Sequence, residues 1–310
     1  MPRITVIGGS NVDIKGRSSG PYRSGTSNPG EVTVSAGGVG RNIAENLARL
    51  GLDVSLITAL GNDANGRFLR EACGRAGFDL SHAITVQDVT GTYLAVLDEK
   101  GEMVSAVSDM RAIDRLEPAH LAAAGEMLAA SDLLVADCNI SIACLDWLCA
   151  FAGPRLLIEP VSVTKAMKLK AFNRSTPVFA VTPNTQQLVA LTGGDIAALH
   201  EMGFANVIVH RGSAGAVVSD GQAVAQIASA AVSAIADVTG AGDAAVAGLV
   251  CGLAEGLPLA EAARLGQHAA AVKLASLNSV ADGLSRDRLM PSLAASKQKP
   301  PLPHMRGGEG

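Results

Sequence analysis

One stretch of the sequence, residues 237–243, reads Asp-Val-Thr-Gly-Ala-Gly-Asp and continues into small and apolar residues at 244–249. This composition predicts a flexible turn that opens a helix with an acidic residue in its first turn. The backbone N–H groups of Gly240, Ala241 and Gly242 would then lie at the positive end of the helix dipole. Such a helix start binds anions, and phosphate is the expected ligand.

Asp243 would lie beside those N–H groups. There it could take a proton from an alcohol as a phosphoryl group arrives. The residues leave a structural alternative open, in which Asp237 caps the helix and the glycines only turn the chain. An aspartate at each end of the heptad favours the catalytic interpretation.

A second glycine cluster, residues 35–42, reads Ser-Ala-Gly-Gly-Val-Gly-Arg-Asn. Apolar residues at three- and four-residue spacing follow it, which predicts a helix that ends at Gly51. Gly37 and Gly38 would let a ligand approach the backbone closely, and Asn42 can donate to and accept from hydroxyl groups. Taken alone, this cluster fits a plain turn before a helix equally well.

The rest of the chain alternates strand and helix patterns, which predicts an α/β fold with a central, mostly parallel sheet flanked by helices. Residues 15–34, rich in Gly, Ser and Pro, interrupt the alternation. So do residues 92–107, which predict two strands around a turn at 98–101. We expect residues 296–310 to form a disordered tail, because they contain few apolar side chains. The apolar runs predict strands at 4–7, 54–59, 133–136, 156–158, 178–181 and 207–209.

The composition excludes several classes of protein. A net charge of −4, a pI near 5.9 and 3% aromatic residues argue against a nucleic-acid partner. With 48% hydrophobic residues and a mean hydropathy of +0.28 the chain can build a sizeable core, yet no apolar run predicts a membrane span. The start lacks a signal-peptide pattern, and the five cysteines show no zinc spacing. We therefore expect a cytoplasmic protein with neither membrane contact nor disulfides nor zinc.

With both glycine segments in hand, the chain resembles the ribokinase-like (PfkB) family of carbohydrate kinases over residues 3–290. The resemblance implies one kinase domain at 1–295, with the two interrupting segments forming a small β lid. It implies ATP and Mg²⁺ as cofactors, a sugar or nucleoside as substrate, and a homodimer formed through the lid. The implied site residues are Asp243 as catalytic base, Gly240, Ala241 and Gly242 as anion hole, and Asn11, Asp13, Gly37, Gly38 and Asn42 around the sugar hydroxyls. Asn11 and Asp13 would otherwise be turn formers after a strand.

On the nucleotide side, the family carries Asn, two residues, then Glu, a motif that organises magnesium and phosphate. Asn184 matches the first position, but Gln187 stands at the last and lacks the charge, which weakens the expected attraction for Mg²⁺. Asn184 as an ordinary helix N-cap remains an alternative.

A loop with Arg211, Gly212 and Gly215 matches the family's triphosphate loop, although His210 stands where most members have Thr or Ser. His268 fits where adenine packs in relatives, and Asp237 is a candidate ligand for K⁺. The alternatives are a hairpin turn for the loop, a structural histidine, and a structural cap for Asp237.

Within the family, the segments at 27–30, 37–44, 108–110 and 136–141 look most like those of members that phosphorylate pseudouridine. The resemblance then implies that Asn139 or Asp109 recognises the ribose or the uracil edge. A kinase for another sugar or nucleoside, of the ribokinase or inosine kinase type, is the first alternative. A nucleoside-binding regulator without catalysis is the second, suggested by Gln187.

Overall fold

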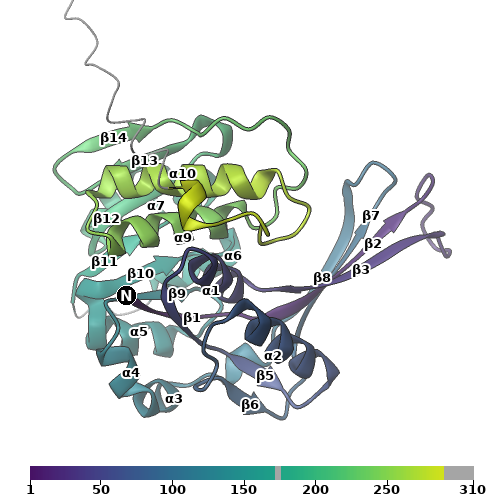
Figure 1. Cartoon of the computed structure of the whole chain (residues 1–310), viewed down its shortest axis with the longest axis horizontal. Coiled ribbons are helices and arrows are strands. Elements are labelled where there is room, and N and C mark those ends of the chain that lie inside the picture. The colour runs from purple at the N-terminus through teal and green to yellow at the C-terminus, as the bar shows by residue number, and fades with distance from the viewer. Residues whose placement is uncertain (172–175, 290–310) are drawn as a thin grey trace, which may run out of the picture.

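The computed structural model describes residues 1–171 and 176–289. Its larger sheet has eight strands in the order β14-β13-β12-β11-β10-β9-β1-β4 (Figure 1). The strands from β12 to β4 in this order are parallel, and the pairs β12–β13 and β13–β14 are antiparallel. The mostly parallel sheet is confirmed. The bounds are β1 Arg3–Ile7, β4 Asp53–Ile57, β9 Leu133–Asp137, β10 Leu156–Glu159, β11 Val178–Val181, β12 Phe204–His210, β13 Ala216–Ser219 and β14 Val224–Ile227.

The strand expected at 54–59 is wrong at its end. β4 stops at Ile57, and the next residues form β5 (Ala59–Gly61), which pairs with β6 (Ile84–Val86) in a separate two-stranded sheet. Thr58, between them, is buried, and its carbonyl accepts from the Ile84 N–H at 2.9 Å. Because residues 54–61 are all buried, the apolar pattern carries no sign of the break between β4 and β5.

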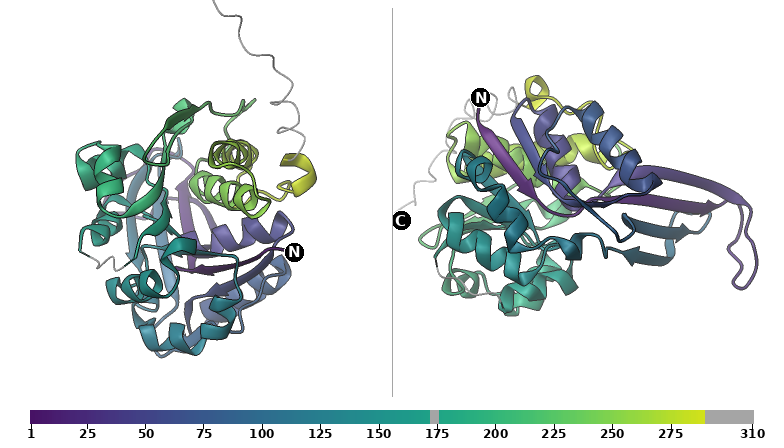
Figure 2. Two further views of the ribbon diagram at one scale, coloured as in Figure 1. Left: turned by 90° about the vertical axis from the view of Figure 1, so that its left-hand side faces the viewer. Right: turned by 90° about the horizontal axis from the view of Figure 1, so that it is seen from below.

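Helices cover both faces of the larger sheet (Figure 2). Apolar side chains of α1, α9 and α10 form one core with the sheet, and those of α3, α4, α5, α7 and α8 form another. The helices are α1 Val39–Arg49, α2 Ala64–Ala76, α3 Pro118–Ala123, α4 Gly125–Ala129, α5 Ile142–Ala152, α6 Val163–Ala166, α7 Thr185–Thr192, α8 Ile196–Glu201, α9 Ala241–Ala254 and α10 Leu259–Leu274.

A four-stranded sheet, hereafter the lid, extends away from this body (Figures 1 and 2). It has the order β3-β2-β7-β8, and its two hairpins are the two segments expected to interrupt the main sheet. β2 begins at Asn11, four residues before the predicted start, so Asn11 and Asp13 belong to a lid strand. The bounds are β2 Asn11–Ser18, β3 Gly30–Gly37, β7 Gly91–Leu97 and β8 Met103–Asp109.

Three other expectations concern the chain as a whole. Within residues 1–171 and 176–289, no helix is both long enough and apolar enough to cross a membrane. All five cysteines are buried and have free thiols. The tail expected at 296–310 lies outside the described residues.

Candidate active site

The turn before α9 has the features of an anion site. Gly240, the N-cap, has φ +83°, and a Cβ added to it would lie 2.0 Å from the Ser279 carbonyl oxygen, so only glycine fits. No side chain caps α9, and open space lies beside Gly242. The N–H of Ala241 donates to Val238 O at 3.2 Å, so the turn uses one amide that the sequence suggested was free. The uncapped helix start is nevertheless suited to an anion.

Asp243 lies in the first turn of α9 with 9% of its surface exposed. Its Oδ2 accepts from Asn42 Nδ2 at 2.7 Å. Burial raises the pKa of Asp243 to about 7, and the nearby Asp137 carboxylate adds to this effect, while the Asn42 hydrogen bond opposes it. A carboxylate with a pKa near neutral is a suitable general base.

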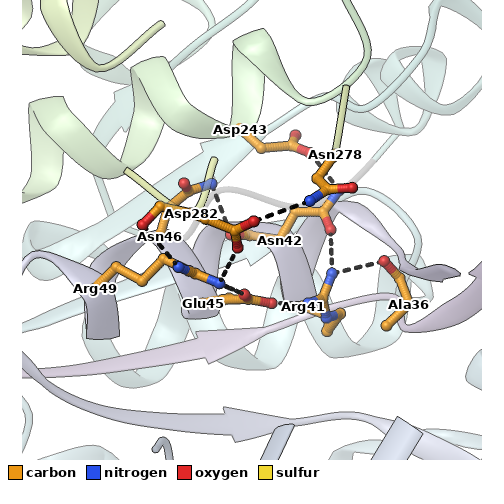
Figure 3. A network of polar contacts seen from close by, with 9 residues as sticks. All are labelled: Ala36, Arg41, Asn42, Glu45, Asn46, Arg49, Asp243, Asn278 and Asp282. Atoms are coloured by element: carbon orange, nitrogen blue, oxygen red, sulfur yellow. Dashed lines mark hydrogen bonds and ion pairs between the residues drawn. The ribbon is translucent and has the colours of Figure 1, made fainter. Parts of the chain in front are cut away.

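The orientation of Asn42 is fixed by the network in Figure 3. Arg41 Nη1 donates to Asn42 Oδ1 and to Ala36 O, both at 2.7 Å. The amide oxygen of Asn42 therefore faces Arg41, which leaves its Nδ2 to face Asp243. Arg41 also pairs with Glu45 on the next turn of α1. The lid strand β3, through Ala36, is thus connected to the candidate base.

Asn11 and Asp13 are both buried at the start of β2, with Asn11 Nδ2 donating to Asp13 Oδ1 at 2.6 Å. Burial raises the pKa of Asp13, and the Asn11 hydrogen bond opposes the rise. Gly37 and Gly38 of the second cluster lie against the protein's own chain. A Cβ on Gly37 would lie 2.2 Å from the Asp13 carboxylate, and one on Gly38, at φ +97°, would lie 2.4 Å from Gly9 O. These contacts require glycine at both positions, and the predicted role of Gly37 and Gly38 in ligand approach stays a prediction.

Asp137, at the end of β9, has no exposed surface and received no role from the sequence. Its carboxylate accepts from Gly9 N at 2.9 Å, Gly40 N at 2.8 Å and Asn139 N at 2.8 Å, and from Asn139 Nδ2 at 2.9 Å. These bonds hold Asn139 beside the first turn of α1. The signal that could have found Asp137 is an acid directly after a buried strand, where α/β sheets bind ligands.

Two lysines beside Asn139 were also missed. Lys165 Nζ donates to Asn139 Oδ1, and Lys168 Nζ donates to the carbonyls of Cys138 and Ile140 at 3.0 and 2.8 Å. Their spacing of three residues in the helical segment after β10 places both ammonium groups on one side. Asn139 thus lies beside two lysine side chains.

Asp109 does not join these residues. The register sets it opposite Thr92, which pairs with Val12, so its side chain lies on the face of the lid away from Asn11 and Asp13. Its carboxylate pairs with Arg111 at 2.6 Å. On the same register, Ser108 lies on the face of Asp13.

On the nucleotide side, Asn184 is the N-cap of α7, as the structural alternative expected. Its Oδ1 accepts from Gln187 N at 2.9 Å, and Gln187 Oε1 accepts from Asn184 N at 2.7 Å, which forms a capping box. Gln187 is buried. Either Gln or Glu can make this box, so the substitution leaves the local fold intact.

The next loop is a short 3₁₀ turn, Gly212–Ala214, between antiparallel strands β12 and β13, with Gly215 closing it. The hairpin alternative is therefore correct in its geometry. Arg211 Nη2 lies 3.3 Å from both Ala214 O, in its own loop, and Gln226 Oε1, on β14. Burial lowers the pKa of His210 to about 4, and its Nε2 has no hydrogen-bond partner among the described residues.

His268, on α10, borders a cavity of about 210 Å³ with Val232 and Ala271 among its other walls. The segment before Val232 connects this cavity to the hairpin loop, because Ser229 Oγ donates to Ser213 O at 2.9 Å. The polar side chains of Ser233 and Arg288 also line this cavity.

Glu159, at the end of β10, is partly buried. Thr182 Oγ1 donates to its Oε2 at 2.7 Å. Burial raises the pKa of Glu159 to about 8, and the carboxylates of Asp243 and Asp137 contribute to the rise. Within the described ranges, no three or more His, Cys, Asp or Glu side chains group closely enough to form a metal cluster.

Asp237 already has a donor on each of its oxygens. Lys15 Nζ lies 3.2 Å from Oδ2, Thr239 N lies 2.8 Å from Oδ1, and Lys273 Nζ lies 2.7 Å from the carbonyl oxygen. Because Gly240 is the N-cap of α9, Asp237 is not the helix cap either. The groups present do not fit a K⁺ ion bound to Asp237.

Comparison with known proteins agrees with this geometry. Residues 1–284 match the model of the family described as pfkB family carbohydrate kinase. Over 283 residues the chain is 32% identical to the pseudouridine kinase of Escherichia coli (strain K12). The alignment covers 87% of this chain and 90% of that protein.

Solved structures give the same result. A carbohydrate kinase from Agrobacterium tumefaciens is 33% identical, with a TM-score of 0.83 over 95% of this chain and 97% of that chain. The Arabidopsis thaliana ribokinase complexed with ribose and ATP shares the fold. It is 21% identical, with a TM-score of 0.81 over 94% of this chain and 98% of that chain. The chain therefore belongs to the pfkB family of carbohydrate kinases, which bind a sugar or nucleoside together with ATP.

Proposed function

We propose that this kinase transfers the γ-phosphoryl group of ATP to the 5′-hydroxyl of pseudouridine, giving pseudouridine 5′-phosphate. The observation that carries the proposal is the buried Asp243 carboxyl, with a pKa near 7, in the first turn of the uncapped helix α9. Asp243 takes the hydroxyl proton while the oxygen forms its bond to the γ-phosphorus and the bond from that phosphorus to the β,γ-bridging oxygen breaks, releasing ADP. The first-turn N–H groups of α9 stabilise the charge on the transferred group.

Mg²⁺ enters with ATP in this proposal and supplies neutralisation of phosphate charge. A fully formed protein cage is not needed, because Mg²⁺ keeps several waters and binds through substrate phosphates and one or two carboxylates. Glu159 and Gln187 are the residues we assign to its side of the cleft. His268 and its cavity would receive adenine, and Asn184, Arg211, Gly212 and Gly215 would border the triphosphate.

Pseudouridine is favoured over other acceptors by the surroundings of Asn139 and by the 32% identity to the pseudouridine kinase of Escherichia coli. Asn11, Asp13 and Asn42 would hold the ribose hydroxyls. Asn139 Oδ1, which already accepts from Lys165, has a second lone pair for a ring N–H. We place the reaction in the cytoplasm, which is consistent with five free, buried thiols.

We also propose a homodimer through the outer face of the lid. One level of the register aligns Val34, Ile14, Leu94 and Val107 across the four strands. Val34 is 57%, Leu94 42% and Val107 63% exposed, which is a large apolar row for a solvent-facing sheet. A second lid is a self-complementary partner for such a row.

Changing both Val34 and Val107 to Asp should shift the protein from dimer to monomer in sedimentation equilibrium, because the charges would be buried at the interface. Val224→Asp, at an equally exposed valine on β14, is the control and should leave the assembly unchanged. A wild-type protein that is monomeric at all concentrations would exclude the lid dimer.

Replacing Asp243 with Asn keeps the shape and the Asn42 contact but removes the base. Turnover should fall about a hundred- to ten-thousandfold, with acceptor binding largely retained. Steady-state rates and calorimetric acceptor binding test this together. Near-normal turnover in Asp243→Asn would remove Asp243 from the mechanism.

The same residue sets a pH dependence. Only the ionised form is a base, so kcat/KM should fall about tenfold per pH unit below the pKa of about 7. Burial raises this pKa above its ordinary 3.8, so Asp243 costs stability as pH rises between the two values. Asp243→Asn should therefore raise the Tm more at pH 8 than at pH 5. Because Asp243 interacts with Asp13, Asp137 and Glu159, the difference between the two proteins reports the coupled titration of these carboxylates.

If the missing charge at Gln187 weakens metal use, Gln187→Glu should move the Mg²⁺ titration of the rate to lower concentrations. The capping box with Asn184 survives this change, so the fold should be unaffected. Melting curves provide that control. An unchanged Mg²⁺ titration in a well-folded variant would mean that position 187 no longer serves the metal.

A screen of sugars and nucleosides with Mg-ATP tests the substrate. Pseudouridine differs from uridine in having a free N1–H on the uracil ring. Uridine would leave the protein acceptor for this N–H unpaired, at a cost of roughly 1–3 kcal/mol. We therefore expect kcat/KM to be about tenfold to hundredfold higher for pseudouridine. Asn139→Ala should narrow this preference. Asp109→Ala tests the other residue named for the base, and its outward side chain predicts the smaller effect.

Equal rates with ribose, uridine or inosine would leave only the broader carbohydrate-kinase assignment. Acceptor-induced melting shifts without ATP turnover would instead favour the nucleoside-binding regulator.

A further inference from the structure

Lys273, on α10, is a lysine with no exposed surface. Its Nζ donates to the carbonyl oxygen of Asp237 at 2.7 Å and to that of Ser276 at 3.1 Å. A buried ammonium group is costly unless its N–H donors are satisfied. Here the acceptors are backbone carbonyls of two separate segments, the start of the anion-binding turn and the chain that follows α10.

These two segments meet at Gly240. The Ser279 carbonyl, three residues beyond Ser276, packs so closely on Gly240 that no side chain fits between them. Ala236 N also donates to Leu274 O at 2.8 Å, just before the turn. Lys273 therefore joins the segment before α9 to the chain after α10, and this contact sets the position of the first amides of α9.

The Asp237 carboxylate lies close enough to act on this ammonium. Burial lowers the pKa of Lys273, and the charge of Asp237 opposes that effect, while Lys15 on the other side of Asp237 adds to it. An ammonium group and K⁺ have similar size, and both bind backbone carbonyl oxygens. The ammonium group differs in being covalently tethered, so no free ion has to be bound.

We propose that the Lys273 ammonium group holds the anion-binding turn in its phosphate-binding geometry, taking the place of a bound monovalent cation. The protein then needs no K⁺. Lys273 is a positioning residue in this proposal, because it contacts the turn and neither substrate. Only the kcat measurement rests on the proposed kinase activity. The melting temperature reports the contacts of Lys273 without any substrate.

The first experiment uses the wild-type protein. KCl is replaced stepwise by tetramethylammonium chloride at constant ionic strength, and both Tm and kcat are measured. We expect neither to change. A saturable rise of Tm or kcat with K⁺ would overturn the proposal, because it would reveal a cation site that Lys273 does not fill.

The second experiment uses Lys273→Met, which keeps the length of the side chain. We expect a lower Tm and a kcat reduced by about ten- to hundredfold, as for a misplaced catalytic group. K⁺ or NH₄⁺ should restore part of both, and tetramethylammonium should not. Leu259→Ala, at the other end of α10, should lower Tm without any response to K⁺.

Full kcat in Lys273→Met would contradict the proposal, and so would a loss of Tm that no small cation restores. If Lys273→Met does not fold, the wild-type titration decides. If no acceptor is phosphorylated, the proposed function fails, and the response of Tm to K⁺ still tests Lys273.

Discussion

The hydrogen bonds accepted by the buried Asp137 carboxylate connect the parts of the chain that form the site. Gly9 follows β1, Gly40 lies in the first turn of α1, and Asn139 follows β9, and all three donate N–H groups to this one side chain. A carboxylate buried without such donors would cost at least several kcal/mol, so the three segments are held together strongly. The position of α1 fixes Asn42, and Asn42 in turn holds Asp243. The position of the candidate base, on α9, therefore depends through α1 and Asn42 on Asp137, at the end of β9.

The same arrangement concentrates negative charge. Asp13, Asp137, Glu159 and Asp243 all have raised pKa values, with burial as the main cause, and for Glu159 and Asp243 neighbouring carboxylates add to it. Ionising all of them together is unfavourable unless positive charge enters the cleft. Lysine side chains from the lid and from the segment after β10 supply some of it, and a metal–nucleotide complex would supply more. A cation-bearing ligand that binds near these carboxylates would favour their ionised forms.

The sequence predicted the features that depend on local pattern. Strand and helix alternation, the two lid hairpins, and the glycine turns before α1 and α9 all follow from spacing and composition within short windows. It did not predict the roles of Asp137, Lys165 or Lys273, because their partners lie in other segments; Asp137 and Gly9 are 128 positions apart. It assigned Gly37 and Gly38 to a ligand, whereas the close neighbours of these glycines are Asp13 and the backbone at Gly9. A glycine pattern predicts a close approach without identifying what approaches.

The departure of the chain from its family's pattern at Gln187 lies on the phosphate side of the proposed site, where backbone groups rather than side chains would bind the ligand. On the acceptor side, the proposed site consists of the buried side chains Asn11, Asp13, Asn42 and Asn139, whose amide and carboxylate groups are fixed by direct hydrogen bonds. Any substitution there changes which hydroxyl or ring N–H can be paired. On the phosphate side, recognition falls to the N–H groups of α9 and to a hairpin turn, and backbone groups do not depend on the identity of neighbouring side chains. Gln187 keeps its capping box with an amide in place of a carboxylate. In the proposed function, the phosphate side therefore tolerates changes of sequence better than the acceptor side, and substrate choice lies in the acceptor-side side chains, of which Asp137 holds Asn139 directly.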